Sequence, residues 1–149
     1  MFNTVLFVVF PYVAVVIAVV VGIYRYRNSR YTYSSLSSQF LENRTLFWGS
    51  APWHYGVILI LTAHGLALLF PKLWGDLLSD QIRLYVLEIS GLALALMTVV
   101  GLSLLILRRL RFSRVSSVTS SADWLLLAAL LVQVAFGYWI ALFYRWGSG

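Results

Sequence analysis

Four long apolar stretches dominate this chain of 149 residues and restrict the folds that it can adopt. They lie near residues 5–24, 52–70, 86–107 and 123–144. Each stretch is close in length to the roughly 20 apolar residues that a helix needs to cross about 30 Å of hydrocarbon. In lipid, a single segment can satisfy its own backbone hydrogen bonds only as a helix. The sequence therefore predicts an all-α integral membrane protein, with four transmembrane helices in a single domain over residues 1–149.

The composition agrees with a membrane protein and excludes several kinds of site. Hydrophobic residues make up 61% of the chain and charged residues 11%, whereas a soluble domain is about half apolar and a quarter charged. The chain has no cysteine, so it can form neither disulfides nor thiolate metal sites. No Lys or Arg precedes Arg25, so the first stretch lacks the positive region of a signal peptide. We expect it to be retained as the first helix.

The positive charges predict an orientation in the membrane. Eight arginines lie in the two segments that follow the first and third stretches: Arg25, Arg27, Arg30, Arg44, Arg108, Arg109, Arg111 and Arg114. The remaining loop and the tail hold three positive residues: Lys72, Arg83 and Arg145. Because cytoplasmic loops are rich in Lys and Arg, the N-terminus is expected outside. The net charge of +6 then needs no nucleic-acid partner.

Prolines and one acidic residue predict where the helices bend and begin. Pro11 falls inside the first stretch and could kink it. Pro52 suits the first turn of the second helix, where its missing N–H does no harm. Pro71 follows that helix and helps to stop it, and Asp123 is expected to cap the fourth helix.

Small residues in the third and fourth stretches recur at helical spacing. Gly91 and Ala95 are four residues apart, as are Gly137 and Ala141. Such pairs let transmembrane helices approach closely, so we expect helix packing at these positions.

Both histidines of the chain lie in the second stretch, within "WHYGVILILTAHG". Ten residues of helix separate His54 from His64 by about 15 Å along the axis, with their directions roughly 80° apart. Three interpretations are open: hydrogen bonds to neighbouring helices, a proton relay, or iron ligation in two haems at different depths. A relay usually employs several carboxylates, and Glu88 lies close to the outer end of the third helix. Two bis-histidine haems would need further axial ligands, which the chain does not contain.

Several motifs occur in an order that is similar to the gamma subunit of respiratory nitrate reductase, a membrane cytochrome b. They are "FPYVA", "YTYSSLSSQFLENR", "HYGVILILTAHG", "LRRLRFSRV", "SSADWLLL" and "VQVAFG". The family has five transmembrane helices, and its fifth carries the second pair of axial histidines. The resemblance implies that this chain is truncated before that helix, so that a fifth helix is expected in the complete protein.

The resemblance also implies roles for individual residues. His54 would ligate the inner, proximal haem and His64 the outer, distal one. Ala63, His64 and Arg83 would contact quinol, although Ala63 replaces a family glycine and Arg83 a family lysine. Arg109, with Arg108 beside it, would lie near the haem propionates, a role compatible with simple anchoring at the membrane surface. Arg83 could likewise be only an interfacial residue.

The implied function is electron transfer in the cytoplasmic membrane. A di-haem b subunit would oxidise quinol near the outer face and pass electrons to a cytoplasmic iron–sulfur beta subunit. A molybdenum alpha subunit would then reduce nitrate, so nitrate reduction itself would not take place in this chain. Two alternatives remain: a haem b subunit of another quinone-linked complex, such as a sulfite-reduction or heterodisulfide-reductase-like assembly, or a haem-free membrane anchor.

Overall fold

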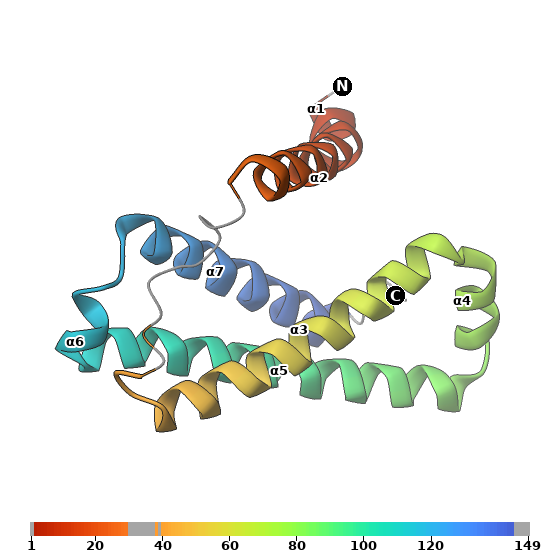
Figure 1. Ribbon diagram of the computed structural model, residues 1–149. Helices are drawn as coiled ribbons and strands as arrows, with labels where there is room; N and C mark the ends of the chain where they lie inside the picture. Colours follow the sequence, from red (N-terminus) through yellow and green to blue (C-terminus); the bar gives the residue numbers. More distant parts are fainter. Residues whose placement is uncertain (1, 30–37, 39, 145–149) are drawn as a thin grey trace. The chain divides into compact units, whose positions relative to one another are not determined.

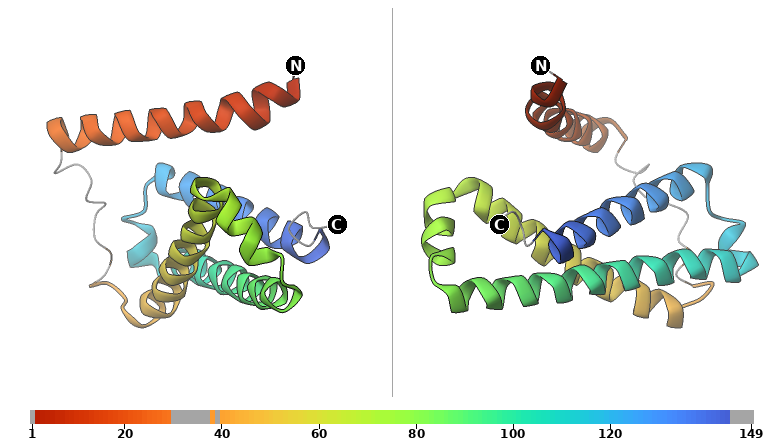
Figure 2. Two further views of the ribbon diagram at one scale, coloured as in Figure 1. Left: turned by 90° about the vertical axis from the view of Figure 1, so that its right-hand side faces the viewer. Right: turned by 180° about the vertical axis from the view of Figure 1, so that it is seen from behind.

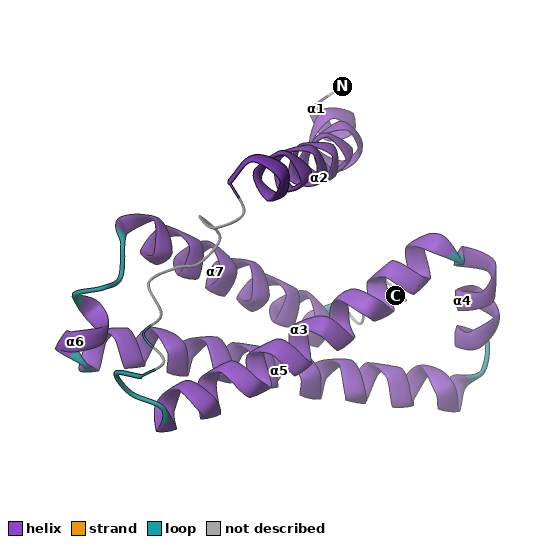
Figure 3. Ribbon diagram, in the orientation of Figure 1, coloured by secondary structure: helices purple, strands orange, loops and turns teal. Residues whose placement is uncertain are grey.

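The computed structural model of the chain describes residues 2–29, 38 and 40–144. All secondary structure in these residues is helical, as Figure 3 shows, which confirms the predicted all-α class. Four of the described helices are long and apolar enough to cross a membrane. The chain divides into two compact units, Met1–Ser37 and Ser38–Gly149.

The first unit is one helical rod whose geometry changes before Pro11. It comprises α1 (Phe2–Thr4), the π-helical segment η1 (Val5–Val9) and α2 (Phe10–Ser29). Within this rod, the N–H of Phe10 donates to the oxygen of Val5, the wider hydrogen bond typical of a π-helix. Because proline has no N–H and displaces the carbonyl four residues earlier, the wider turn accommodates the disturbance that we expected from Pro11.

The second unit opens with α3 (Arg44–Leu69), which begins well before the predicted start at Pro52. The placement of Pro52 in the first turn is therefore wrong, since this proline lies inside the helix. The Glu42 carboxylate explains the earlier start. Its oxygens accept from the N–H groups of Thr45 at 2.7 Å and Leu46 at 3.3 Å. These are donors that a helix N-terminus otherwise leaves without partners.

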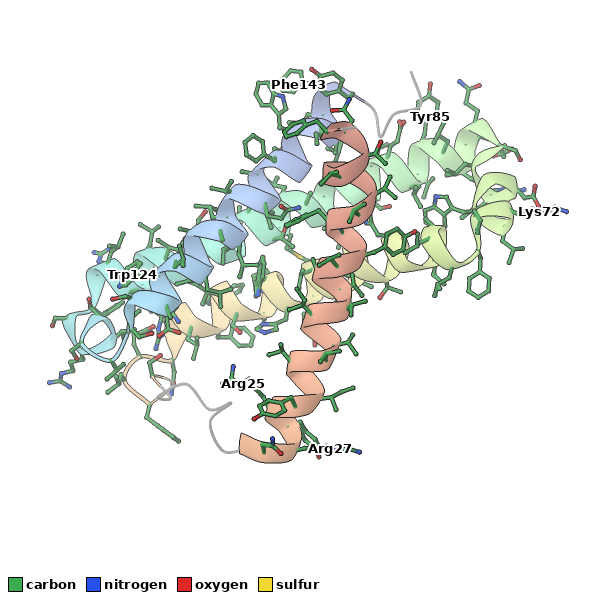
Figure 4. All side chains as sticks on the ribbon, turned by 90° about the horizontal axis from the view of Figure 1, so that it is seen from above. Arg25, Arg27, Lys72, Tyr85, Trp124 and Phe143 are labelled. Carbon is green, nitrogen blue, oxygen red and sulfur yellow. The ribbon has the colours of Figure 1, made fainter. Side chains whose placement is uncertain are left out.

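A short helix that the sequence analysis did not predict follows α3. As expected, α3 ends just before Pro71, but this proline also starts α4 (Pro71–Leu78). Figure 4 shows Lys72 on α4 pointing away from α3 and α5. Asp80 then caps α5 (Gln81–Arg111) by accepting from the N–H groups of Ile82 and Arg83. This helix extends beyond the predicted residues 86–107 at both ends.

The last elements are α6 (Ser113–Ser116) and α7 (Ser121–Phe143). The cap of α7 is Ser120, not Asp123 as predicted. Asp123 completes a capping box instead, because its carboxylate accepts from the N–H of Ser120 while the Ser120 hydroxyl accepts from the N–H of Asp123. Trp124 and Phe143 lie at opposite ends of α7 (Figure 4).

Helix α5 is the central element of the second unit and contacts both α3 and α7 (Figures 1 and 2). Its crossing with α3 depends on glycines. A Cβ atom on Gly101 would lie 2.7 Å from the oxygen of Gly49 and from the nitrogen of Trp53, and one on Gly56 would collide with the Thr98 methyl group. A small core of Leu102, Leu105 and Leu127 lies beside this crossing.

Most large apolar side chains of α3, α5 and α7 remain exposed, for example Leu61, Ile89 and Phe136. A chain that faced water would not leave so much apolar surface uncovered. The four long helices therefore belong to a multi-pass membrane protein.

Candidate functional site

The ring of His54 is anchored to its own helix, one turn earlier. Its Nδ1 lies 2.7 Å from the backbone oxygen of Ser50 and 3.1 Å from the Ser50 hydroxyl. When Nδ1 donates its proton to the carbonyl, the lone pair of the ring lies on Nε2, the tautomer that ligates a metal. The His54 side chain is exposed on α3.

His64 has the same local arrangement, since its Nδ1 lies 2.8 Å from the backbone oxygen of Ile60. Its surroundings differ from those of His54. His64 lines two neighbouring cavities, and the wall that they share also contains Ile60 and Gly91. His54 lines neither of these two cavities. The structure therefore separates the two predicted ligands by environment.

The larger cavity, the α3–α5–α7 cavity, has a volume of about 370 Å³. Small residues form much of its wall: Gly91, Ala95, Gly137 and Ala141. A Cβ on Gly137 would meet no atom within 4 Å, so this glycine does not make the close helix contact that we expected. The spacing of these small residues leaves an apolar space beside His64 instead.

The smaller cavity, the α3–α4–α5 cavity, has a volume of about 200 Å³. It brings together Ala63 and His64, two of the three residues predicted to contact quinol. Arg83 does not line it and is exposed near the start of α5. Trp74 of α4 and Glu88 of α5 line the cavity instead.

Arg108 and Arg109, the two arginines predicted to lie near the haem propionates, have different environments. Arg108 is 1% exposed, and its guanidinium is occupied by the segment before α3. Nε donates to a Glu42 carboxylate oxygen at 2.9 Å, Nη1 to the Ser38 hydroxyl at 3.0 Å, and Nη2 to the backbone oxygens of Ser38 and Glu42. Arg109 is half-buried, and its Nε has no hydrogen-bond partner in the described part of the chain. Of the two, Arg109 is the one with a donor to offer.

The Arg108 contact also acts on the carboxylate of Glu42. Burial raises the pKa of this group, but the hydrogen bonds from Arg108 and from the first N–H groups of α3 outweigh that effect. The pKa of Glu42 therefore lies below its ordinary value. The ion pair places the segment before α3 and the end of α5 at the same end of the second unit, as Figure 1 shows.

The residues around His64 fit part of a haem site. Haem needs an apolar slot for its ring and an imidazole whose Nε2 carries the lone pair. The α3–α5–α7 cavity supplies such a slot, and the Ile60 carbonyl holds His64 in the required tautomer. Within the described residues, no three His, Asp or Glu side chains come together as ligands for a bare metal ion.

Comparison with known proteins decides the family. A family model for the nitrate reductase gamma subunit matches residues 3–149. The chain belongs to the nitrate reductase gamma subunit family. This gamma-family chain is 29% identical over 136 residues to the respiratory nitrate reductase 1 gamma chain of Escherichia coli K12. The aligned residues make up 91% of this chain and 60% of the E. coli protein. The predicted resemblance is confirmed.

Two further relatives show how the gamma-family sequence occurs in proteins of different length. The nitrate reductase gamma chain of Bacillus subtilis 168 is 28% identical over 139 residues, which are 92% of this chain and 62% of that protein. The nitrate reductase-like protein NarX of Mycobacterium tuberculosis is 27% identical, and the match covers only 21% of its length. The chain thus spans about three fifths of the two gamma chains named above.

The sequence assigned no binding role to three residues of this gamma-family chain that contact or lie beside the predicted site residues. Glu88 had a usable signal, because an acidic residue inside an apolar helix is expensive and often functional. Ser50 and Glu42 had none, since a serine one turn before a histidine and a glutamate in a polar loop are ordinary. Only the fold shows that Ser50 contacts the His54 ring and that Glu42 meets Arg108.

Proposed function

We propose that this chain is the di-haem cytochrome b subunit of a respiratory nitrate reductase. It oxidises quinol near the outer face and transfers the electrons to an iron–sulfur beta subunit on the cytoplasmic side. A molybdenum alpha subunit there reduces nitrate. The chain crosses the cytoplasmic membrane several times, with its N-terminus outside. Its family and its gamma-chain relatives support this proposal.

The single observation that carries the proposal is the position of His64 between two cavities. One cavity is largely apolar and has four small residues in its wall, which suits a flat macrocycle. The other holds Ala63 and Glu88 beside an indole ring, which suits a small aromatic substrate with polar groups. A ligating imidazole in the shared wall would bring an electron donor and an electron acceptor close together without a path through water.

The chain's own residues would bind and orient the two reactants. His64 Nε2 would hold the iron of the outer haem, and His54 Nε2 would hold that of the inner haem. The Ser50 and Ile60 carbonyls would hold the two rings in the required tautomer. Arg109 would pair with a propionate, whereas Arg108 is engaged by Glu42 and Ser38. When bound, two b-type haems would supply one-electron carriers at two depths in the membrane.

Two alternative functions, a haem-free membrane anchor and a haem b subunit of another quinone-linked complex, make different predictions. The described residues supply only single histidines, so a haem-free anchor is favoured if the second ligands do not come from elsewhere. A haem b subunit of another quinone-linked complex would keep the same sites and differ in the partner that takes the electrons.

A reduced-minus-oxidised spectrum of the protein purified with its membrane complex tests the proposal. We expect b-type bands from two haems. In His64→Ala, quinol should no longer reduce either haem, because the outer site is lost. In His54→Ala, the outer haem should still be reduced by quinol while transfer to nitrate stops.

The matched control is Thr62→Ala. Thr62 lies on the same helix and, like the histidines, contacts the carbonyl one turn earlier, with 2.7 Å between its hydroxyl and the oxygen of Ile58. We expect this variant to keep both haems. Absence of b-type bands in the wild-type complex would refute the haem proposal. Equal loss of both haems in the two histidine variants would show a folding defect rather than loss of a ligand.

A further inference from the structure

Glu88 belongs to a helix long and apolar enough to span a membrane, and it places a carboxyl group in the wall of the largely apolar α3–α4–α5 cavity. It lies seven residues after the start of α5, or about 10 Å along the axis. It is half-buried and lines the α3–α4–α5 cavity together with His64 and Trp74. Because ionisable side chains are costly at such positions, they usually serve a function.

The helical geometry of α5 explains why Glu88, and not Arg83, faces this cavity. Leu84, Leu87, Glu88 and Gly91 all line it and follow the spacing of a single helix face. Arg83 precedes Glu88 by five residues, which turns its direction by about 140°. The residue that the sequence predicted as the polar contact of quinol therefore points away from the predicted partner residues Ala63 and His64.

Two other polar side chains of the cavity make hydrogen bonds to the backbone of their own helices. The Ser90 hydroxyl donates to the oxygen of Leu87 at 3.1 Å, and Nδ1 of His64 is held by the oxygen of Ile60. Glu88 is the carboxyl group among the residues that line the cavity. A ligand that donates a hydrogen bond would therefore find its acceptor there.

The size and the lining of the cavity restrict the ligand. Its volume of about 200 Å³ is below the roughly 300–1,000 Å³ of pockets for drug-sized molecules. Leu59, Leu94 and the Trp74 indole give it apolar and aromatic walls. A one- or two-ring aromatic head group with a hydroxyl fits this chemistry, with any apolar tail remaining in lipid.

We propose that Glu88 is a binding residue of the quinol site and accepts the hydrogen bond of a ring hydroxyl. The proposal rests on the proposed function, because it assigns a polar contact to the same quinol site. It differs from the expectation for the family in that the contact comes from an acidic residue within α5 and not from the basic residue near its start.

Binding of 1,4-naphthoquinol and of its dimethyl ether tests the proposal. The two molecules share the ring system, but only the quinol can donate a hydrogen bond. Binding is followed anaerobically through quenching of tryptophan emission, and the part of the signal lost in Trp74→Phe reports on this cavity. The wild-type protein should bind the quinol about tenfold more tightly than the ether, as expected for one additional hydrogen bond.

Three variants distinguish a hydrogen bond from a structural effect. Glu88→Leu should reduce the quinol-to-ether ratio to near one while binding of the ether is retained. Glu88→Gln should restore most of the ratio, because the amide oxygen is also an acceptor. Arg83→Gln, the matched control on the same helix, should keep the wild-type ratio.

In the wild-type protein, a quinol-to-ether ratio near one, or no quenching that depends on Trp74, would overturn the proposal. Among the variants, an unchanged ratio in Glu88→Leu or a lost ratio in Arg83→Gln would do the same. Equal losses of the ratio in Glu88→Leu and Glu88→Gln would also contradict it. The haem spectrum of the same samples tests the proposed function separately. Samples without b-type bands that still show the Glu88-dependent ratio would refute the cytochrome function and leave the binding role of Glu88 intact.

Discussion

Nε of Arg108, near the end of α5, lies 2.9 Å from a carboxylate oxygen of Glu42, although the two residues are 66 positions apart in the sequence. The Arg108 side chain is fully buried, and that of Glu42 is 13% exposed. Because Glu42 also accepts from the first N–H groups of α3, this pair joins the start of one spanning helix to the end of another.

Removal of Arg108 should therefore destabilise the second unit strongly. We expect Arg108→Met to lower the free energy of unfolding by about 3–5 kcal/mol, because Glu42 and the Ser38 oxygen lose their buried donor. Arg111→Met, an exposed arginine in the same last turn, should change it by no more than about 0.5 kcal/mol. Urea titration in detergent measures both, and equal effects would contradict a special role of Arg108.

Stability should also fall at acid pH because of Glu42. Its pKa is lowered in the folded protein, so its contribution is complete above the ordinary glutamate pKa of about 4.3 and is lost as the pH falls from there through the folded value. Thermal unfolding between pH 7 and pH 3 measures this loss. The fall should be smaller in Glu42→Gln, and identical profiles would show that another group is responsible.

The crossing of α3 and α5 should not tolerate a side chain at Gly101. A Cβ there would meet backbone atoms of Gly49 and Trp53 at 2.7 Å, and backbone cannot move aside cheaply. We expect Gly101→Ala to cost about 1–3 kcal/mol. Gly137→Ala, also in a helix interior but with open space, should be neutral or stabilising by up to about 1 kcal/mol. A thermal shift in detergent compares the two, and a neutral Gly101→Ala would disprove the tight crossing.

Filling the α3–α5–α7 cavity should displace haem without unfolding the protein. Gly137→Leu places a bulky side chain in the wall beside His64, so we expect the b-type absorption of the purified complex to fall by about half, as one of two haems is lost. Ala135→Leu, at an exposed position on the same helix, should leave the absorption unchanged. Retention of both haems in Gly137→Leu would show that haem does not occupy this cavity.

The length and composition of the apolar stretches were enough to predict the class of the protein and the number of long helices. The residues at which the helices begin and end were less predictable. Proline statistics favoured a start at Pro52, but the carboxylate of Glu42, ten residues earlier, supplies the partners that let α3 begin at Arg44. Helix α4 was missed because eight residues are too few to span a membrane, and the prediction rested on spanning length.

The order of motifs also identified the family and the two histidines, because local sequence records which residue types a chain carries and how far apart they lie along a helix. Local sequence does not record which face of a helix meets another helix. Only the tertiary structure put His64 in the wall of two cavities, turned Arg83 away from Ala63, engaged Arg108 with Glu42 and brought Glu88 beside Trp74. The physical reason is that the glycine crossing of α3 and α5 sets the rotation of both helices, and that rotation decides which side chains share a space.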